Sequence, residues 1–273
     1  MSKLFLNNNQ RVFGTFPLTG NTAIQAITDA IQVGYRAFDT AQMYGNEADV
    51  GTALSQSGLP RNEFCVITKV HPDNYTNQDT FLASVEKSVN RLKLDTIDVL
   101  FLHWPPSNGQ IDQPLEFLQA ARERGLTQEI GISNFNAKMM RRARDIVDGP
   151  IAANQIEFHP LLNQQTLLNT SAETGIALFA YSSIARGEVF KYALFNELAT
   201  KYSKHPGQIV LRWILQKGVI ANTMSTKLEN IRQNYDVMDF IISTPDMARI
   251  DELSKINYRV VTSAKVPWAP EWD

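Results

Sequence analysis

The sequence predicts an α/β protein: a (β/α)8 or TIM barrel with an N-terminal β-hairpin and a C-terminal tail over or near its active-site face. Strand-like and helix-like segments alternate about eight times, which is typical of βαβ units and a parallel sheet. The 273 residues suit one barrel of about 250 residues, and no break in composition separates two halves. A single domain over residues 1–273 is therefore favoured over two small ones. An open, doubly wound sheet is the alternative, and the absence of a Gly-x-Gly-x-x-Gly run weighs against it.

The elements follow from local composition. A hairpin is expected at Leu4–Leu6 with its turn at Asn7–Gln10. Runs rich in β-branched and aromatic residues predict eight strands, at Val12–Gly14, Arg36–Asp39, Phe64–Lys69, Val99–His103, Glu129–Ser133, Ala153–Glu157, Ala177–Ser182 and Val219–Asn222. Apolar residues at helical spacing predict helices at Thr22–Val33, Glu47–Ser57, Asp79–Leu92, Pro114–Glu123, Lys138–Ile146, Gln164–Glu173 and Ile231–Met238. The longer link between the last two strands carries two more, Ala193–Tyr202 and Pro206–Gln216.

Composition excludes several classes of protein. The net charge of −2 and the pI near 6.1 give no basic surface for nucleic acid, so none is expected as a partner. No apolar run approaches the roughly 20 residues of a membrane span, and the N-terminus lacks the apolar core of a signal peptide. The single Cys65 excludes an internal disulfide and fits a reducing compartment. A cytoplasmic, monomeric protein that acts on a small molecule is expected.

Four ionisable residues make up the predicted reaction centre. Asp39, Lys69 and His103 end three predicted strands, and Tyr44 follows the first of them closely. In a parallel barrel, the C-terminal strand ends converge on the face where such enzymes do chemistry. A phenol with an ordinary pKa near 10 is a reluctant proton donor. We expect the Lys69 ammonium, kept charged by Asp39, to lower the pKa of Tyr44, while His103 holds a carbonyl oxygen.

Two other reactions are weighed for the same residues. Lys69 could form a Schiff base, but the adjacent aspartate would keep it protonated and poorly nucleophilic. A metal site is not expected, because His71, His159 and His205 show no metal-ligand spacing. Hydride transfer to a carbonyl carbon, with Tyr44 protonating the oxygen, is favoured.

A second predicted feature would bind phosphate. The segment after the last strand begins a helix, whose N-terminus attracts anions. There Ser225 and Thr226 could cap the helix and donate to phosphate, and Lys227 adds charge. A plain Ser/Thr helix cap is the alternative. At the end of another strand, Tyr181 could stack on a flat heterocycle.

The order of several motifs resembles the aldo-keto reductases, and most closely the short bacterial members that include 2,5-diketo-D-gluconate and methylglyoxal reductases. The shared motifs are Gly14-Thr15-Phe16, Phe38-Asp39-Thr40-Ala41-Gln42-Met43-Tyr44-Gly45-Asn46-Glu47, Lys69, Leu102-His103-Trp104-Pro105, Gly131-Ile132-Ser133-Asn134-Phe135, Asn154-Gln155-Ile156-Glu157 and the ending Ala269-Pro270-Glu271-Trp272-Asp273. The resemblance implies carbonyl reduction with Tyr44 as the acid, Lys69 and Asp39 as its tuning pair and His103 as the orienting residue.

The resemblance also implies a nicotinamide cofactor. Ser133, Asn134 and Gln155 would hold the carboxamide, Tyr181 would stack on the ring, and Ser182, Ile184 and Arg186 would lie along the pyrophosphate. The other implied cofactor residues are Gly14, Thr15, Phe16, Asp39, Ser225, Thr226, Lys227, Asn230 and Asn234. Many members carry Ile-Pro-Lys-Ser, and an Arg six residues after that Lys, where this chain has Asn222-Thr223-Met224-Ser225 and Asn230. Ser183 likewise replaces a common proline. NADP(H) is expected, with NAD(H) possible because two cations are missing.

Substrate specificity is expected from loops and the C-terminal tail. Phe16, His71, Trp104 and Trp268 are predicted to line the substrate pocket, and His71 replaces a tryptophan common among relatives. The proline-rich tail would either fold over the pocket as a lid or pack on the barrel wall. Dicarbonyls, keto-acids, keto-sugars and aromatic aldehydes all fit as carbonyl substrates. A cofactor-binding barrel with a mainly regulatory or structural role is the alternative function.

Overall fold

The computed structural model describes residue 2, residue 4 and residues 10–273 of the chain. Its sheet has eight parallel strands in the order β7-β6-β5-β4-β3-β2-β1-β8. Ile220, directly before β8, pairs with Phe179 of β7 and joins the two ends of the sheet into a barrel. The strands are β1 (Arg11–Gly14), β2 (Ala37–Asp39), β3 (Cys65–Val70), β4 (Ile97–Leu102), β5 (Thr127–Ser133), β6 (Ala153–Glu157), β7 (Ala177–Tyr181) and β8 (Ala221–Thr223). The predicted barrel is confirmed.

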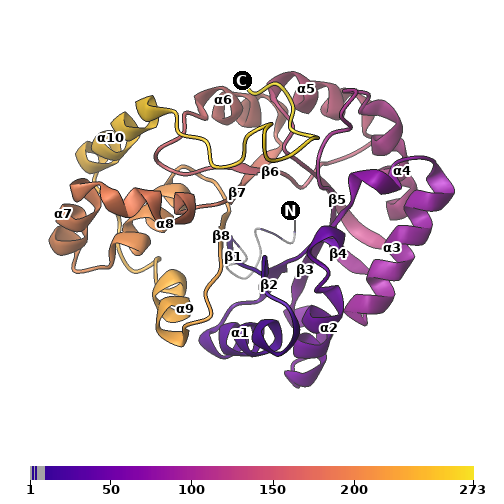
Figure 1. Ribbon diagram of the computed structural model, residues 1–273, viewed down its shortest axis with the longest axis horizontal. Helices are drawn as coiled ribbons and strands as arrows, with labels where there is room; N and C mark the ends of the chain where they lie inside the picture. Colours follow the sequence, from indigo (N-terminus) through magenta and orange to yellow (C-terminus); the bar gives the residue numbers. More distant parts are fainter. Residues whose placement is uncertain (1, 3, 5–9) are drawn as a thin grey trace.

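Helices surround the barrel on all sides (Figure 1). They are α1 (Gly20–Val33), α2 (Glu47–Gln56), α3 (Gln78–Leu92), α4 (Asp112–Glu123), α5 (Ala137–Ile146), α6 (Gln165–Thr174), α7 (Ala193–Tyr202), α8 (Pro206–Gln216), α9 (Leu228–Tyr235) and α10 (Thr244–Glu252). Both predicted helices of the long connection have the observed bounds, and Pro206 occupies the first turn of α8, where its missing N–H costs no hydrogen bond.

Several predicted bounds were wrong near the C-terminus. The helix placed at Ile231–Met238 begins earlier, at Leu228, and ends at Tyr235. The last strand lies at Ala221–Thr223 rather than Val219–Asn222, and α10 was not predicted. The sequence does carry a start signal for α10, because Ser243 caps it and a proline occupies its first turn. The predicted N-terminal hairpin lies almost wholly outside the described residues.

Apolar side chains fill two separate spaces. Inside the barrel, Val12, Ile67, Phe101 and Phe179 pack together, and a larger core lies between the sheet and the helices. Strands β3 and β4 are buried along their whole length, which explains their largely apolar composition. Among the described residues, no helix is long and apolar enough to cross a membrane.

Candidate active site

A buried ion pair lies at the C-terminal ends of β2 and β3. Lys69 Nζ donates to Asp39 Oδ1 at 2.6 Å and to the Thr40 carbonyl at 2.9 Å, and both charged side chains are buried. Asp39 accepts two further hydrogen bonds, from Gln155 Nε2 to Oδ1 and from Asn222 Nδ2 to Oδ2, each at 3.1 Å. Burial of the pair, together with donors from β6 and β8, fixes the carboxylate from several sides.

Tyr44 and His103 complete the predicted group of four. Tyr44 ends a short 3-10 helix after β2, and its Oη lies 3.4 Å from Lys69 Nζ. The His103 ring stands edge-on to the Tyr44 ring, with centroids 5.5 Å apart. The His103 backbone N–H donates to Tyr75 Oη at 3.0 Å, while the buried ring atom Nδ1 has no partner. The structure thus brings all four side chains to one point on the C-terminal face.

The local charges set the protonation states. Burial raises the pKa of the Tyr44 phenol well above its ordinary value near 10, and Asp39 raises it further. This differs from the expectation that Lys69 lowers it, because burial disfavours the charged phenolate and the nearby Asp39 carboxylate repels it. Burial lowers the pKa of Lys69, and Asp39 opposes that shift. The pKa of His103 falls well below 6.5 through burial and then through Lys69 and His71, so its imidazole is neutral at pH 7.

Three buried polar side chains lie beside this group. Ser133 Oγ donates to the Gln155 carbonyl, and Asn134 Nδ2 donates to Ser133 Oγ and to the His103 carbonyl. Asn134 has a left-handed backbone with φ of 63°, and its Oδ1 accepts from Tyr181 Oη at 2.8 Å. The predicted carboxamide-binding residues and the predicted stacking ring therefore form one hydrogen-bonded unit with His103.

The loop after β7 has an unusual backbone. Ser182, Ala185 and Arg186 have φ near +50°, and Gly187 has φ of 97°. Left-handed conformations of non-glycine residues are costly and cluster at ligand sites. The loop starts at the active-site face, because β7 ends at Tyr181. Its residues Ser182, Ile184 and Arg186 are the ones that the resemblance assigns to a pyrophosphate.

The segment before α9 differs from its prediction. No side chain caps α9; Lys227 occupies the N-cap position, and Ser225 Oγ accepts from the Lys227 N–H at 3.1 Å. The expectation that Ser225 or Thr226 caps the helix was wrong, because that turn precedes the helix. Asn230 and Asn234 lie on α9. Within the described part of the chain, no hydrogen bond joins this segment to the group of four.

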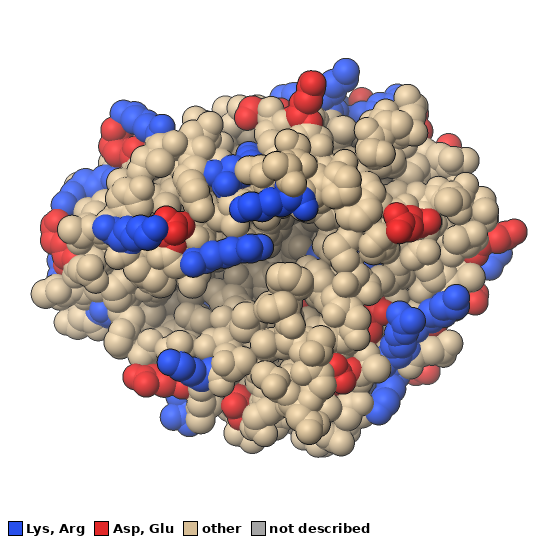
Figure 2. Space-filling view, in the orientation of Figure 1, with Lys and Arg blue, Asp and Glu red and all other residues tan. Residues whose placement is uncertain are grey.

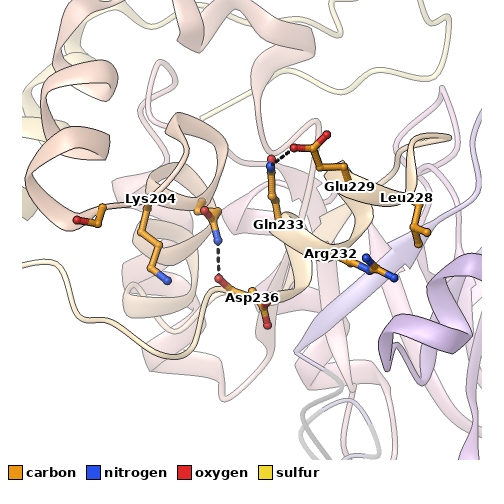
Figure 3. A pocket seen from close by; sticks show the side chains of 8 residues that line it. Lys204, Leu228, Glu229, Arg232, Gln233 and Asp236 are labelled. Atoms are coloured by element: carbon orange, nitrogen blue, oxygen red, sulfur yellow. Dashed lines mark hydrogen bonds between the residues drawn. The ribbon is translucent and has the colours of Figure 1, made fainter.

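A pocket of about 420 Å³ lies between α9 and the turn that joins α7 to α8 (Figure 3). Glu229 accepts from Gln233 at 3.2 Å across its wall, and Lys204 is paired with Asp239 at 2.5 Å. The pocket is lined by residues of α9, the helix that follows the predicted phosphate-binding segment, and by none of the four ionisable residues. It is lined by Ser203, Lys204, Gln208, Leu228, Glu229, Arg232, Gln233 and Asp236.

The C-terminal tail lies over the active-site face (Figure 1). Trp268 stands edge-on to His71, with ring centroids 5.3 Å apart, and Trp272 stands edge-on to Trp104 at 6.3 Å. The fourth predicted pocket residue, Phe16, is exposed and packs against Tyr44 at 5.1 Å. Figure 2 shows this face hollowed near its centre, with Lys and Arg side chains along one side of the hollow.

Polar contacts anchor the C-terminal tail, residues 257–273, at both ends. Glu157, at the end of β6, accepts from the backbone N–H groups of Val260 and Val261, at 2.6 and 2.9 Å. The Ala137 N–H, at the start of α5, donates to Asp273 Oδ2 at 2.8 Å. Sequence reasoning assigned no role to Glu157 or to Asn222, and its signal for them was a polar residue at each strand end. The indoles of the tail are thus held against the predicted pocket.

Comparison with known proteins agrees with this geometry. The profile of the aldo/keto reductase family matches residues 12–255. Methylglyoxal reductase DkgB of Escherichia coli O157:H7 is 36% identical over 264 residues, which are 95% of this chain and 97% of that relative. A solved structure described as a putative 2,5-diketo-D-gluconic acid reductase B has a TM-score of 0.92 at 38% identity, covering 96% of this chain and 92% of that chain. The aldo-keto reductase of Bombyx mori in complex with NADP has a TM-score of 0.86 at 30% identity, covering 95% and 94%.

Proposed function

Because the chain belongs to the aldo/keto reductase family, we propose that it reduces small aldehydes and ketones with NADP(H), using Tyr44 as the general acid. Carbonyl reduction with a nicotinamide cofactor is the activity of the family. The observation that carries the role of Tyr44 is its position 3.4 Å from Lys69, whose ammonium is held by Asp39.

The chain's own residues would move the proton. Tyr44 holds its proton at neutral pH, since burial and Asp39 raise its pKa. When the phenol gives that proton to a carbonyl oxygen, Lys69 is close enough to stabilise the phenolate. His103 is neutral, so it orients the oxygen by a hydrogen bond without adding charge to the site. Preorganised groups of this kind act most strongly where charge develops in the transition state.

The residues around the site fit a nicotinamide cofactor, which supplies the hydride when bound. Ser133, Asn134 and Gln155 present buried hydroxyl and amide groups beside Asp39, as a carboxamide requires. The Tyr181 ring, fixed by its hydrogen bond to Asn134, offers a flat surface. Ser182, Ile184 and Arg186 would lie along the pyrophosphate, and Gly14, Thr15 and Phe16 near its nicotinamide end.

NADP(H) is proposed over NAD(H) because Ser225, Thr226 and Lys227 offer two hydroxyls and one cation for a further phosphate. The NADP complex of the Bombyx mori relative supports the same choice. Met224 and Asn230 are uncharged and Glu229 is negative, so these three positions do not favour an additional phosphate. The preference for NADPH over NADH therefore requires direct measurement. Fluorescence titrations with NADPH and NADH in parallel would decide it, and tighter NADH binding would reverse the assignment.

The substrates proposed are small and varied. Phe16, His71, Trp104 and Trp268 combine aromatic surface with one polar ring, which suits dicarbonyls, keto-acids, keto-sugars and aromatic aldehydes. The name of the Escherichia coli relative makes methylglyoxal the first substrate to test.

Replacement of Tyr44 by Phe tests the reaction against the alternative, a cofactor-binding barrel with a regulatory or structural role. A general acid contributes about 100- to 10,000-fold, so Tyr44→Phe should lower methylglyoxal-dependent NADPH oxidation by at least that lower factor. The dissociation constant for NADPH should stay the same. The matched control is Tyr202→Phe on the outer helix α7, which removes a hydroxyl that donates to Asp246 of α10. Undiminished turnover in Tyr44→Phe would show that another group is the acid.

A further inference from the structure

We propose that Asn222 is a positioning residue that holds the Asp39 carboxylate in the orientation that Lys69 and Tyr44 need, a role that rests on the proposed function. Asn222 Nδ2 donates to Asp39 Oδ2 at 3.1 Å, while Lys69 and Gln155 both donate to the other oxygen. Among the described residues, Asn222 supplies the side-chain hydrogen bond to Oδ2. Without it, the carboxylate would be held at one oxygen and free to turn about that contact.

The side chain reaches Asp39 across an intervening strand. Asn222 pairs with Val12 in the register of β8 and β1, and Gly14 pairs with Asp39 in the register of β1 and β2. A methyl group added at Gly14 would lie 2.6 Å from Asn222 Oδ1, well inside van der Waals contact. Gly14 therefore leaves the space through which the Asn222 amide passes. The glycine and the asparagine form a matched pair.

Charge fixes the direction of the amide. The Nδ2 donor faces the Asp39 carboxylate, and Oδ1 is buried without a partner. The flipped amide would place an oxygen against a carboxylate oxygen and remove the donor from Oδ2. The unpaired, buried Oδ1 lowers the stability of the folded protein, and the hydrogen bond from Nδ2 to Asp39 offsets that loss. A residue with only a packing role would not need this arrangement.

The contact involves positions where the chain departs from the pattern that the family resemblance implies for many members. Asn222 and Thr223 stand in place of Ile-Pro, and Ser183 stands in place of a proline. Ser183 Oγ donates to the Asn222 carbonyl at 2.7 Å, and Thr223 Oγ1 lies 3.3 Å from Tyr35 Oη. Ser183 and Asn222 are thus linked to each other and, through Asn222, to Asp39, and they act as one polar unit that an Ile-Pro sequence lacks.

The unit acts on Tyr44 through Asp39. The charged and titratable groups that face Tyr44 are Asp39, Lys69, His103 and Tyr181. Asp39 raises the pKa of Tyr44, and the Asn222 donor disperses part of that negative charge. Loss of the donor should make Tyr44 a weaker acid and move the alkaline limb of the kcat profile to higher pH.

The variant Asn222→Leu tests the role at nearly constant volume. We expect kcat for methylglyoxal to fall about tenfold, the size of losing one hydrogen bond to a charged group, with the alkaline limb shifted upward. KM and the NADPH dissociation constant should stay within twofold. Asn196→Leu, on the outer helix α7, is the control. Gly14→Ala is the second variant, because it displaces the amide while keeping Asn222 and should lower kcat in the same direction.

A readout that needs no turnover separates this inference from the proposed function. In protein labelled with ¹³C-aspartate, the Asp39 carboxyl resonance can be assigned by its loss in Asp39→Asn. Asn222→Leu should move that resonance, and Asn196→Leu should not. An unmoved resonance with unchanged kcat and pH profile would overturn the role of Asn222. If the wild-type protein shows no turnover, the proposed function fails, and the resonance alone decides whether Asn222 holds Asp39.

Discussion

Replacement of Lys69 by Met should measure how much the buried ion pair with Asp39 contributes to the free energy of unfolding. The Lys69 side chain is fully buried and that of Asp39 is 3% exposed, so the variant leaves a carboxylate inside the protein without its cation. Removing one partner of a buried pair costs about 3–5 kcal/mol. The free energy of unfolding of a domain is about 5–15 kcal/mol, so the loss is a large share of the whole. Gln155 and Asn222 still donate to Asp39, which places the expected loss near the lower figure.

Urea unfolding followed by tryptophan fluorescence gives the free energy for each variant. The double variant Asp39→Asn/Lys69→Met removes both charges and keeps an oxygen for one of the two remaining donors, so it should recover at least half of the loss. Neither variant should be active. Lys191→Met is the control, because it breaks an exposed ion pair of similar length, 2.8 Å, and should have little effect. A Lys69→Met protein within about 0.5 kcal/mol of wild type would refute the reasoning.

Two further predictions concern pH and packing. The pKa of folded His103 lies well below 6.5, so the unfolded chain binds more protons as the pH falls below about 6.5, and stability is lost in that direction. The His103→Gln variant should therefore lose less stability than wild type between pH 7 and pH 5 in urea titrations; equal losses would contradict the shift. Gly131→Ala would place a methyl group 2.7 Å from the buried Phe101 ring and should cost about 1–3 kcal/mol. Gly207→Ala, whose nearest neighbour would lie 3.9 Å away, is the control and should not destabilise.

The barrel was predictable because its signal is local. Strands β3 and β4 are buried on both faces, and that burial favours the largely apolar runs seen in the sequence. The bounds near β8 and α9 were less predictable, because that strand is short and carries Asn222 and Thr223 instead of apolar residues. Its place is fixed by pairing with β1, which is more than 200 positions away in the chain.

The candidate site was predictable to the same extent. Asp39, Lys69 and His103 mark strand ends, so their meeting follows from the topology of a parallel barrel. The direction of the pKa shift of Tyr44 was not predictable, since it depends on the burial of the phenol and on the charge of Asp39, which lies 2.6 Å from Lys69. The contact of Asn222 with Asp39 depends on the missing side chain at Gly14, a relation between three strands that no single motif contains.

Closure of the barrel and the chemistry of the site depend on each other. The Asp39 carboxylate receives donors from β3, β6 and β8, and the hydroxyl of Thr15, just after β1, donates to its backbone carbonyl. The β8 donor is in place only because β8 pairs with β1, and Ile220 ties the same segment to β7. A substitution that weakens the pairing between β7 and the segment that begins β8 should therefore change the orientation of the Asp39 carboxylate before it unfolds the protein. Catalysis would then respond to packing at a seam that no substrate needs to touch.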